Sequence, residues 1–338
     1  MHVLVTGGTG FVGYHTARAL LSAGHDVTLL VRSLDKAHQL FGSDQLQRVV
    51  RGDINDADSV RRALRGCDAL VHSAAVVSTS RKDAGQVFER NTNGTRTVIQ
   101  AGLDANLQAL IYVSSVTALF DEHARTLNEH SPPGPESHRG AYGRSKVAGE
   151  IYARSMQDDG APVYITYPGS VVGPEDPGLT EPHKGLIGLM YGIAPQMPSG
   201  NQYIDVRDLA EAHLRILEQL PSGKRFPMGG TFLPWRDHGK LLATLTGRRF
   251  LPLPVLPGVP LLAGALLDRL SQVLTLELPI TEEGMRYATR WVQLDDSHTL
   301  KTLDLQYRPL AETFEAALLS LHATGHLSQR QLGRLAQH

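Results

Sequence analysis

The sequence of 338 residues contains one cysteine, Cys67, so no disulfide can form within the chain. A chain without disulfides fits a reducing compartment, and we expect a cytoplasmic protein. We expect Cys67 to be a small packing residue and not a nucleophile. The chain begins with an apolar run, His2–Thr6, without the charged and apolar regions of a signal peptide, so no signal peptide is expected.

An excess of charge of either sign is also lacking. The 33 Lys and Arg residues nearly balance the 34 Asp and Glu residues, for a net charge of -1. These totals imply no basic face, and we expect no nucleic-acid partner. A His-Glu-x-x-His motif and the Gly-x-Ser-x-Gly motif of a hydrolase nucleophile are absent from the sequence. We therefore expect neither a metal site nor a hydrolase of that kind.

Long apolar runs are rare, and the uncharged, apolar stretch at residues 250–267 contains four prolines. Prolines remove backbone donors and kink helices, so we expect no stable membrane insertion. Three interpretations stay open for this stretch. It is a buried loop that leads into an apolar helix, the wall of an apolar substrate pocket, or a site of weak membrane contact.

Strand-like and helical patterns alternate through the first half of the chain. Strands are expected at residues 2–6, 26–31, 48–51, 69–73, 109–114 and 162–167, and helices at 14–23, 58–65, 87–105 and 142–157. Such alternation predicts an α/β fold, a Rossmann-type doubly wound parallel sheet. We assign residues 1–168 and 203–224 to this dinucleotide-binding domain, 169–202 and 225–330 to a smaller, irregular substrate-binding domain, and 331–338 to a tail.

A glycine-rich turn, Thr-Gly-Gly-Thr-Gly-Phe-Val-Gly at residues 6–13, lies between the first strand and the first helix. In that context Gly7 permits a tight turn, Gly10 lets the backbone approach a pyrophosphate, and Gly13 lets the helix pack on the strand. The N–H groups of the helix N-terminus then face the phosphates. The turn predicts dinucleotide binding through Gly7, Thr9, Gly10, Phe11, Val12 and Gly13.

The end of the second strand indicates which dinucleotide is bound. An acidic residue there accepts the ribose 2′-hydroxyl of NAD, whereas this strand ends in Arg32. A guanidinium suits the 2′-phosphate of NADP. The sequence therefore favours NADP over NAD, although it leaves open whether Arg32 fully excludes NAD.

Tyr142 and Lys146 are four residues apart, so on a helix they share one face. An ammonium group beside a phenol lowers the phenol pKa from about 10, which would let Tyr142 exchange a proton with a carbonyl or alcohol oxygen. Ser114 and Ser115 follow the fifth strand, where a hydroxyl could hold the reacting oxygen near Tyr142.

These elements, in this order, resemble the extended short-chain dehydrogenase/reductase family over residues 1–215. The resemblance implies a catalytic set of Ser115, Tyr142 and Lys146, with Ser115 preferred to Ser114, and adds Asn91 from an Asn-x-x-Gly-Thr setting. Lys146 would also contact the nicotinamide ribose. The resemblance implies further cofactor contacts, which are Asp53, Ile54, Ala74, Ala75, Pro168, Gly169 and Val171.

Within this family, members that act on nucleotide sugars carry an Asn near the end of the sixth strand and an Arg before a Val-x-Asp-x-Ala element. This chain has Tyr167-Pro168-Gly169 and Gln202-Tyr203-Ile204 at those places. The remaining pattern looks like the dihydroflavonol-reductase-like branch. It implies an NADPH-dependent carbonyl reductase for an apolar ketone or aldehyde.

Two alternatives stay open at this point. The first is a nucleotide-sugar epimerase or dehydratase, and the second is a non-catalytic NADP-binding regulatory protein. Members of the family are often dimers through two helices, whereas others are monomers, so a homodimer is also left open.

Overall fold

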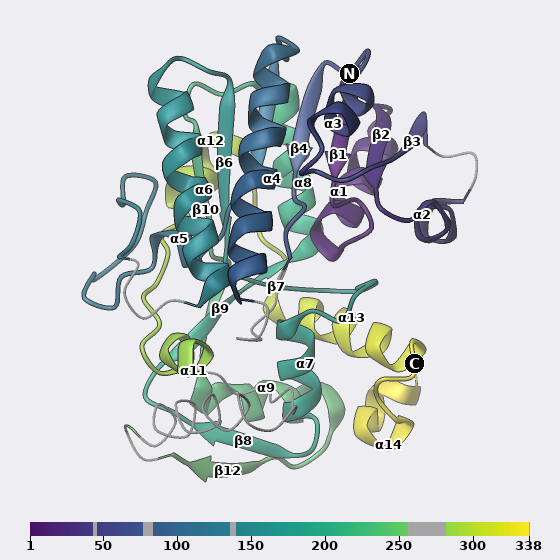
Figure 1. Ribbon diagram of the computed structural model, residues 1–338. Helices are drawn as coiled ribbons and strands as arrows, with labels where there is room; N and C mark the ends of the chain where they lie inside the picture. The colour runs from purple at the N-terminus through teal and green to yellow at the C-terminus, as the bar shows by residue number, and fades with distance from the viewer. Residues whose placement is uncertain (43–45, 77–83, 136–139, 256–257, 259–281, 338) are drawn as a thin grey trace.

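The computed structural model describes residues 1–42, 46–76, 84–135, 140–255, 258 and 282–337 (Figure 1). Its centre is a seven-stranded parallel sheet in the order β10-β6-β5-β4-β1-β2-β3. The strands are β1 (His2–Thr6), β2 (Asp26–Val31), β3 (Arg48–Arg51), β4 (Ala69–His72), β5 (Ala109–Val113), β6 (Val163–Pro168) and β10 (Arg225–Met228). The predicted fold class is confirmed, because the sequence order 3-2-1-4-5-6 is that of the Rossmann fold.

Helices cover both faces of this sheet, and alternate residues of β1 point to opposite faces. Val3 and Val5 pack with α1 (Phe11–Ser22), α2 (Leu34–Phe41) and α8 (Val206–Gln219). Leu4 packs on the other face with α3 (Ala57–Leu64), α4 (Ala84–Asp104) and α6 (Ala141–Asp158). Each layer therefore has its own apolar core, and the carboxyl ends of the strands meet at one edge.

A smaller unit lies below that edge in Figure 1. It contains a three-stranded sheet in the order β11-β9-β7 and a parallel pair, β8 and β12. The strands are β7 (Ser170–Val172), β8 (Ile193–Gln196), β9 (Gly200–Asp205), β11 (Thr231–Pro234) and β12 (Leu251–Pro254). Besides α8, the helices in the described part of the C-terminal half are α7 (Glu181–Leu189), α9 (Trp235–Thr246), α11 (Glu282–Thr289), α12 (Ser297–Leu303), α13 (Leu310–Ala323) and α14 (Gln329–Leu332).

The strand β10 is not expected from the sequence, because residues 225–330 are assigned to the smaller substrate-binding domain. Residues 225–228 instead pair with β6 and extend the large sheet. The segment Arg-Phe-Pro-Met is short and contains a proline, so it lacks a strand pattern. Pro227 is tolerated because β10 is an edge strand, where one missing N–H costs no ladder bond.

Two further expectations need correction in the C-terminal half. The expected tail at 331–338 contributes Leu332 and Leu335 to a buried cluster with α9 and α13, because both side chains are apolar and meet that core. In the uncharged run 250–267, residues 256–257 and 259–267 lie outside the described residues, whereas Leu251 and Leu253 in β12 are 67% and 48% exposed. This part of the run is therefore not a buried loop.

Candidate active site

The glycine turn after β1 is closed by a 2.8 Å hydrogen bond from Gly10 N to Gly7 O. Gly7 has a φ of +77°, and a Cβ atom there would lie 2.7 Å from the backbone N of Ala74. A Cβ atom on Gly13 would lie 2.3 Å from Gly7 O. No side chain caps the start of α1, because its N-cap residue is Gly10. The turn therefore brings the backbone close to β4 and leaves the first N–H groups of the helix for a ligand.

A cavity of about 250 Å³ opens beside this turn at the carboxyl edge of the sheet. It brings together residues that the sequence places far apart in the chain. The predicted cofactor-site residues among its lining are Gly7, Thr9, Gly10, Arg32, Asp53, Ile54, Ala74 and Ala75, and the predicted catalytic residue Asn91 lines it too.

The carboxylate of Asp53 lies on the wall of this cavity. Its Oδ1 accepts hydrogen bonds from Asn55 N at 2.9 Å and Asn55 Nδ2 at 3.1 Å, and its Oδ2 is 3.5 Å from Arg90 Nη2. The backbone N–H of Asn55 is the largest cause that lowers the Asp53 pKa, with smaller contributions from the Asn55 side chain, Arg90 and Arg32. Asp53 is therefore an ionised hydrogen-bond acceptor at neutral pH.

The sequence interpretation missed several residues of this cavity. They are Leu30, Val31, Lys36, Gly52, Asn55, Ser73, Val76 and Arg90. The spacing of Lys36 carried a usable signal, because it lies four residues after Arg32. Ser33 is the N-cap of α2 and accepts a 3.3 Å hydrogen bond from Lys36 N, so the first turn of this helix brings Lys36 to the cavity.

Other predicted cofactor residues do not line this cavity. Phe11 is buried, and its ring packs edge-on against His15 and His183. Val12 and Gly13 follow it in the first turn of α1. Pro168 ends β6 and Val171 lies in β7. Between them, Gly169 sits so close to β10 that a Cβ atom would lie 2.6 Å from Gly229 O.

The two serines after β5 differ in their surroundings. Ser114 is buried, and its Oγ donates a 3.0 Å hydrogen bond to Glu150 Oε2. Ser115 is half-buried and is the N-cap of α5 (Val116–Leu119), where its Oγ accepts a hydrogen bond from Thr117 N at 3.2 Å. Ser115 can also turn its hydroxyl hydrogen to Thr117 Oγ1, at 3.0 Å. Of these two serines, Ser115 is the one that a ligand could reach, and its hydroxyl is not bonded to a buried carboxylate.

Tyr142 and Lys146 lie in the first two turns of α6, and the Lys146 Nζ is 5.8 Å from the centre of the Tyr142 ring. Lys146 is buried, and its Nζ donates a 2.8 Å hydrogen bond to Val113 O. Burial lowers the pKa of Lys146 to about 8, and the Glu150 carboxylate opposes this effect. The helical spacing predicted from sequence thus places an ammonium beside the phenol.

Asn91 joins the cavity beside the glycine turn to this helix. Its Oδ1 accepts from Val76 N at 2.8 Å, and its Nδ2 donates to Val76 O at 3.0 Å and to Ser145 Oγ at 3.2 Å. Ser145 Oγ in turn donates to the carbonyl of Tyr142 at 2.7 Å. Asn91 therefore holds both the loop after β4 and the start of α6.

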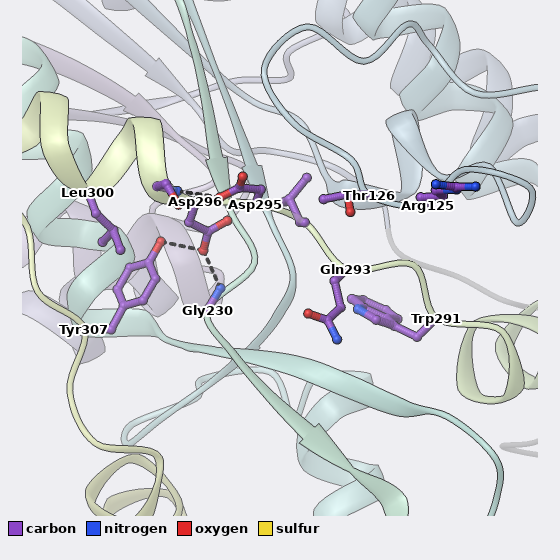
Figure 2. A pocket seen from close by; sticks show the side chains of 11 residues that line it. Arg125, Thr126, Gly230, Trp291, Gln293, Asp295, Asp296, Leu300 and Tyr307 are labelled. Carbon is purple, nitrogen blue, oxygen red and sulfur yellow. Dashed lines mark hydrogen bonds between the residues drawn. The ribbon is translucent and has the colours of Figure 1, made fainter.

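A second cavity, of about 610 Å³, lies between residues 125–126 and the segment 291–307 (Figure 2). On its floor, Asp296 accepts hydrogen bonds from Gly229 N, Gly230 N and the Tyr307 hydroxyl, at 2.7 to 2.9 Å. Burial raises the pKa of Asp296 to about 6. None of the predicted site residues lines this cavity, so it is separate from the candidate active site.

Among the helices in the described part of the chain, none combines the length and apolar character that a membrane crossing requires.

Known proteins share both the sequence pattern and the fold. A protein of Synechocystis sp. named "Putative dihydroflavonol 4-reductase" is 29% identical over 330 residues, which are 93% of this chain and 92% of that protein. "Sterol demethylase protein B" of Methylococcus capsulatus is 28% identical over 78% of this chain and 81% of its own length.

Among solved structures, a UDP-glucose-4-epimerase from Stenotrophomonas maltophila with bound NAD has a TM-score of 0.73 at 20% identity and covers 97% of this chain and 100% of its own. At this identity the likeness concerns the fold. The similar proteins include reductases, dehydrogenases and epimerases, and the prediction of an NAD(P)-dependent oxidoreductase is confirmed.

A protein-family model matches residues 3–229, a range that includes the glycine turn, the cavity beside it, Ser115, Tyr142 and Lys146. The chain belongs to the NAD dependent epimerase/dehydratase family.

Proposed function

We propose that this protein is an NADPH-dependent reductase of an apolar ketone or aldehyde. The observation that carries the proposal is the arrangement of three side chains. Tyr142 and Lys146 lie side by side on α6, and Lys146 is bonded to the end of β5, where the accessible Ser115 follows. Asn91 ties this group to the cofactor cavity.

The cavity beside the glycine turn fits a dinucleotide. Cβ atoms on Gly7 and Gly13 would collide with the backbone, whereas a Cβ atom on Gly10 would approach only Gly7 O, at 3.3 Å. Gly10 thus leaves room where a pyrophosphate approaches the backbone. Arg32 and Lys36 would hold the 2′-phosphate of NADP, and Asp53 would accept a hydrogen bond from the adenine end.

The residues of the chain would handle the proton in this reaction. A dinucleotide held in the cavity beside the glycine turn would supply the hydride for the carbonyl carbon. Tyr142 donates its phenolic proton to the carbonyl oxygen, and the Lys146 ammonium stabilises the phenolate left behind. Ser115 donates a hydrogen bond to the same oxygen and orients it toward Tyr142.

Two observations favour an apolar carbonyl over a nucleotide sugar. One relative named above is called a putative dihydroflavonol 4-reductase, a name that describes a reductase and not a nucleotide-sugar enzyme. Gln202, at the place where an arginine is expected in sugar-nucleotide enzymes, is buried and bonded to Leu294 N, Leu294 O and Gly230 O. These bonds occupy its amide, so Gln202 is a structural residue and not a diphosphate ligand.

The test is an assay of a panel of apolar ketones and aldehydes, in which turnover is measured as the loss of NADPH absorbance. Wild-type protein should reduce at least one of them, and Tyr142→Phe should lower kcat by about a hundredfold or more with an unchanged Kd for NADPH. Tyr152→Phe is the matched control, because Tyr152 lies on the same helix and its hydroxyl bonds Gln100. Epimerisation of a UDP- or TDP-sugar without net NADPH consumption would favour the epimerase alternative, and NADPH binding with no turnover of either kind would favour a regulatory protein.

A further inference from the structure

The carboxylate of Glu150 is fully buried behind the proposed catalytic residues. Its Oε2 accepts a hydrogen bond from Ser114 Oγ at 3.0 Å. Its Oε1 accepts from the Tyr167 hydroxyl at 2.5 Å and from Arg154 Nε at 2.6 Å. A buried carboxylate is costly unless it is paired and hydrogen-bonded, and these donors supply that compensation.

Three charged side chains follow one another on the same face of α6. Lys146, Glu150 and Arg154 are each four residues apart, so their charges alternate along the helix. Arg154 is tied to Ser131 O at 2.9 Å and to the Tyr167 hydroxyl at 3.3 Å, in addition to Glu150. The lysine hydrogen bond, by contrast, goes to the neutral carbonyl of Val113.

Glu150 also contacts the segments that carry the proposed chemistry. Ser114 lies between Val113, whose carbonyl holds Lys146, and Ser115. Tyr167 lies directly before Pro168 at the end of β6. One carboxylate therefore joins α6 to the carboxyl ends of β5 and β6.

We infer that Glu150 is a positioning residue: its negative charge keeps the buried Lys146 in the ammonium form, and its bond to Ser114 fixes the end of β5 that carries Ser115. The part of this inference that concerns catalysis rests on the proposed function. The part that concerns the charge of Lys146 does not depend on it.

Within the described part of the chain, the other titratable groups around Lys146 do not supply a negative charge at neutral pH. His72 of β4 is buried, and desolvation lowers its pKa to about 3, with Lys146 contributing. Tyr112 of β5, whose ring centre is 5.2 Å from Lys146 Nζ, and Tyr167 of β6 both have a pKa raised by burial. Tyr142, on α6 itself, is the proton donor of the proposed reaction. Glu150 is the carboxylate that raises the pKa of Lys146 against desolvation.

The test is a pH titration of Lys146 by NMR on protein labelled with 13C-lysine, with the resonance assigned by its absence in Lys146→Arg. In Glu150→Gln, which keeps the shape of the side chain but not its charge, the midpoint should fall by about one pH unit or more. The control is Tyr167→Phe, which removes a hydrogen bond and leaves the carboxylate, so its midpoint should stay within about half a unit of wild type. An unchanged midpoint in Glu150→Gln overturns the inference.

Wild-type protein alone gives a second measurement if Glu150→Gln does not fold. A buried lysine that has no carboxylate nearby titrates at about pH 5 to 6. A wild-type midpoint for Lys146 in that range would therefore also overturn the inference. If carbonyl reduction is observed, the alkaline limb of kcat/KM should move to lower pH in Glu150→Gln and not in Tyr167→Phe. A shifted NMR midpoint in a protein that reduces no carbonyl would refute the proposed function and leave the electrostatic role of Glu150 standing.

Discussion

Arg32 and Lys36 are two cations, four residues apart, that both line the cavity beside the glycine turn. If both contact a 2′-phosphate, Lys36→Ala should weaken NADPH binding roughly tenfold and leave NADH binding unchanged, because a charge-assisted bond contributes about 1.5 to 3 kcal/mol. Arg32→Asp should reverse the preference toward NADH, since a carboxylate repels the phosphate and accepts the ribose hydroxyl.

Both effects can be measured as Kd values from NADPH and NADH fluorescence titrations. Gln39→Ala, at an exposed position on the same helix, is the control. An equal loss for NADPH and NADH in Lys36→Ala would mean that this side chain does not read the 2′-phosphate.

At this scale the sequence was informative where a residue type has a backbone or charge role. Gly7 and Arg32 could be found because a positive φ needs glycine and a phosphate needs a cation. Asn55 and Arg90 were missed because their part in the site depends on side-chain directions that spacing alone does not fix, whereas the spacing of Lys36 from Arg32 could have indicated its place in the cavity. The choice between Ser114 and Ser115 likewise depended on Glu150, which is distant in sequence.

Among the secondary-structure elements, the close approach of α1 to the turn after β1 leaves no room for a side chain at Gly13. In Gly13→Ala the new Cβ atom would meet Gly7 O at 2.3 Å, and because this atom belongs to the backbone of the tight turn it cannot move aside freely. The variant should lose about 1 to 3 kcal/mol of unfolding free energy and bind NADPH more weakly.

The matched control for this change is Gly185→Ala in α7, where a Cβ atom would meet nothing within 4 Å. Alanine is the better helix former, so this variant should gain about 0.5 to 1 kcal/mol. Urea unfolding of both variants measures the difference. A Gly13→Ala protein as stable as wild type would show that the turn is not tightly packed against the helix.

The strands and helices of the large sheet follow from alternating apolar patterns, and six of its seven strands were predicted within a residue or two. β10 was not, because four residues with an internal proline acquire strand character only by pairing with β6. The same holds for the smaller unit, where β7, β9 and β11 are short and come together from distant parts of the chain.

For the whole molecule, buried histidines set the dependence of stability on pH. His213 and His72 are buried, each bonded to threonine hydroxyls, and desolvation lowers the pKa of each to about 3. The unfolded chain takes up these protons below about pH 6.5, whereas the folded protein does not, so stability falls with pH from there. Between pH 7 and pH 5 each of the two histidines should lower the free energy of unfolding by about 2 kcal/mol.

Urea unfolding at pH 7 and pH 5 tests this, and His213→Gln should lose less stability over the interval than wild type. Asp296 has the opposite effect on stability, because its pKa in the folded protein is raised to about 6. Protonation of Asp296 stabilises the folded protein, and this stabilisation is lost as the pH rises through that value. Asp296→Asn should therefore lose more stability than wild type on acidification. Parallel curves for the three proteins would contradict both assignments.

The parallel pair β8 and β12 has a consequence for self-association. Leu251 N donates to Gly192 O, just before β8, at 2.7 Å, and Val255 N donates to Gln196 O at 3.3 Å, so the alternate positions, Pro252 and Pro254, face away from that partner. Proline has no N–H, and the outer side of β12 therefore offers no donor at those two positions to a strand of another molecule. The exposed leucines of this strand are thus guarded against amyloid-like strand addition by the prolines beside them.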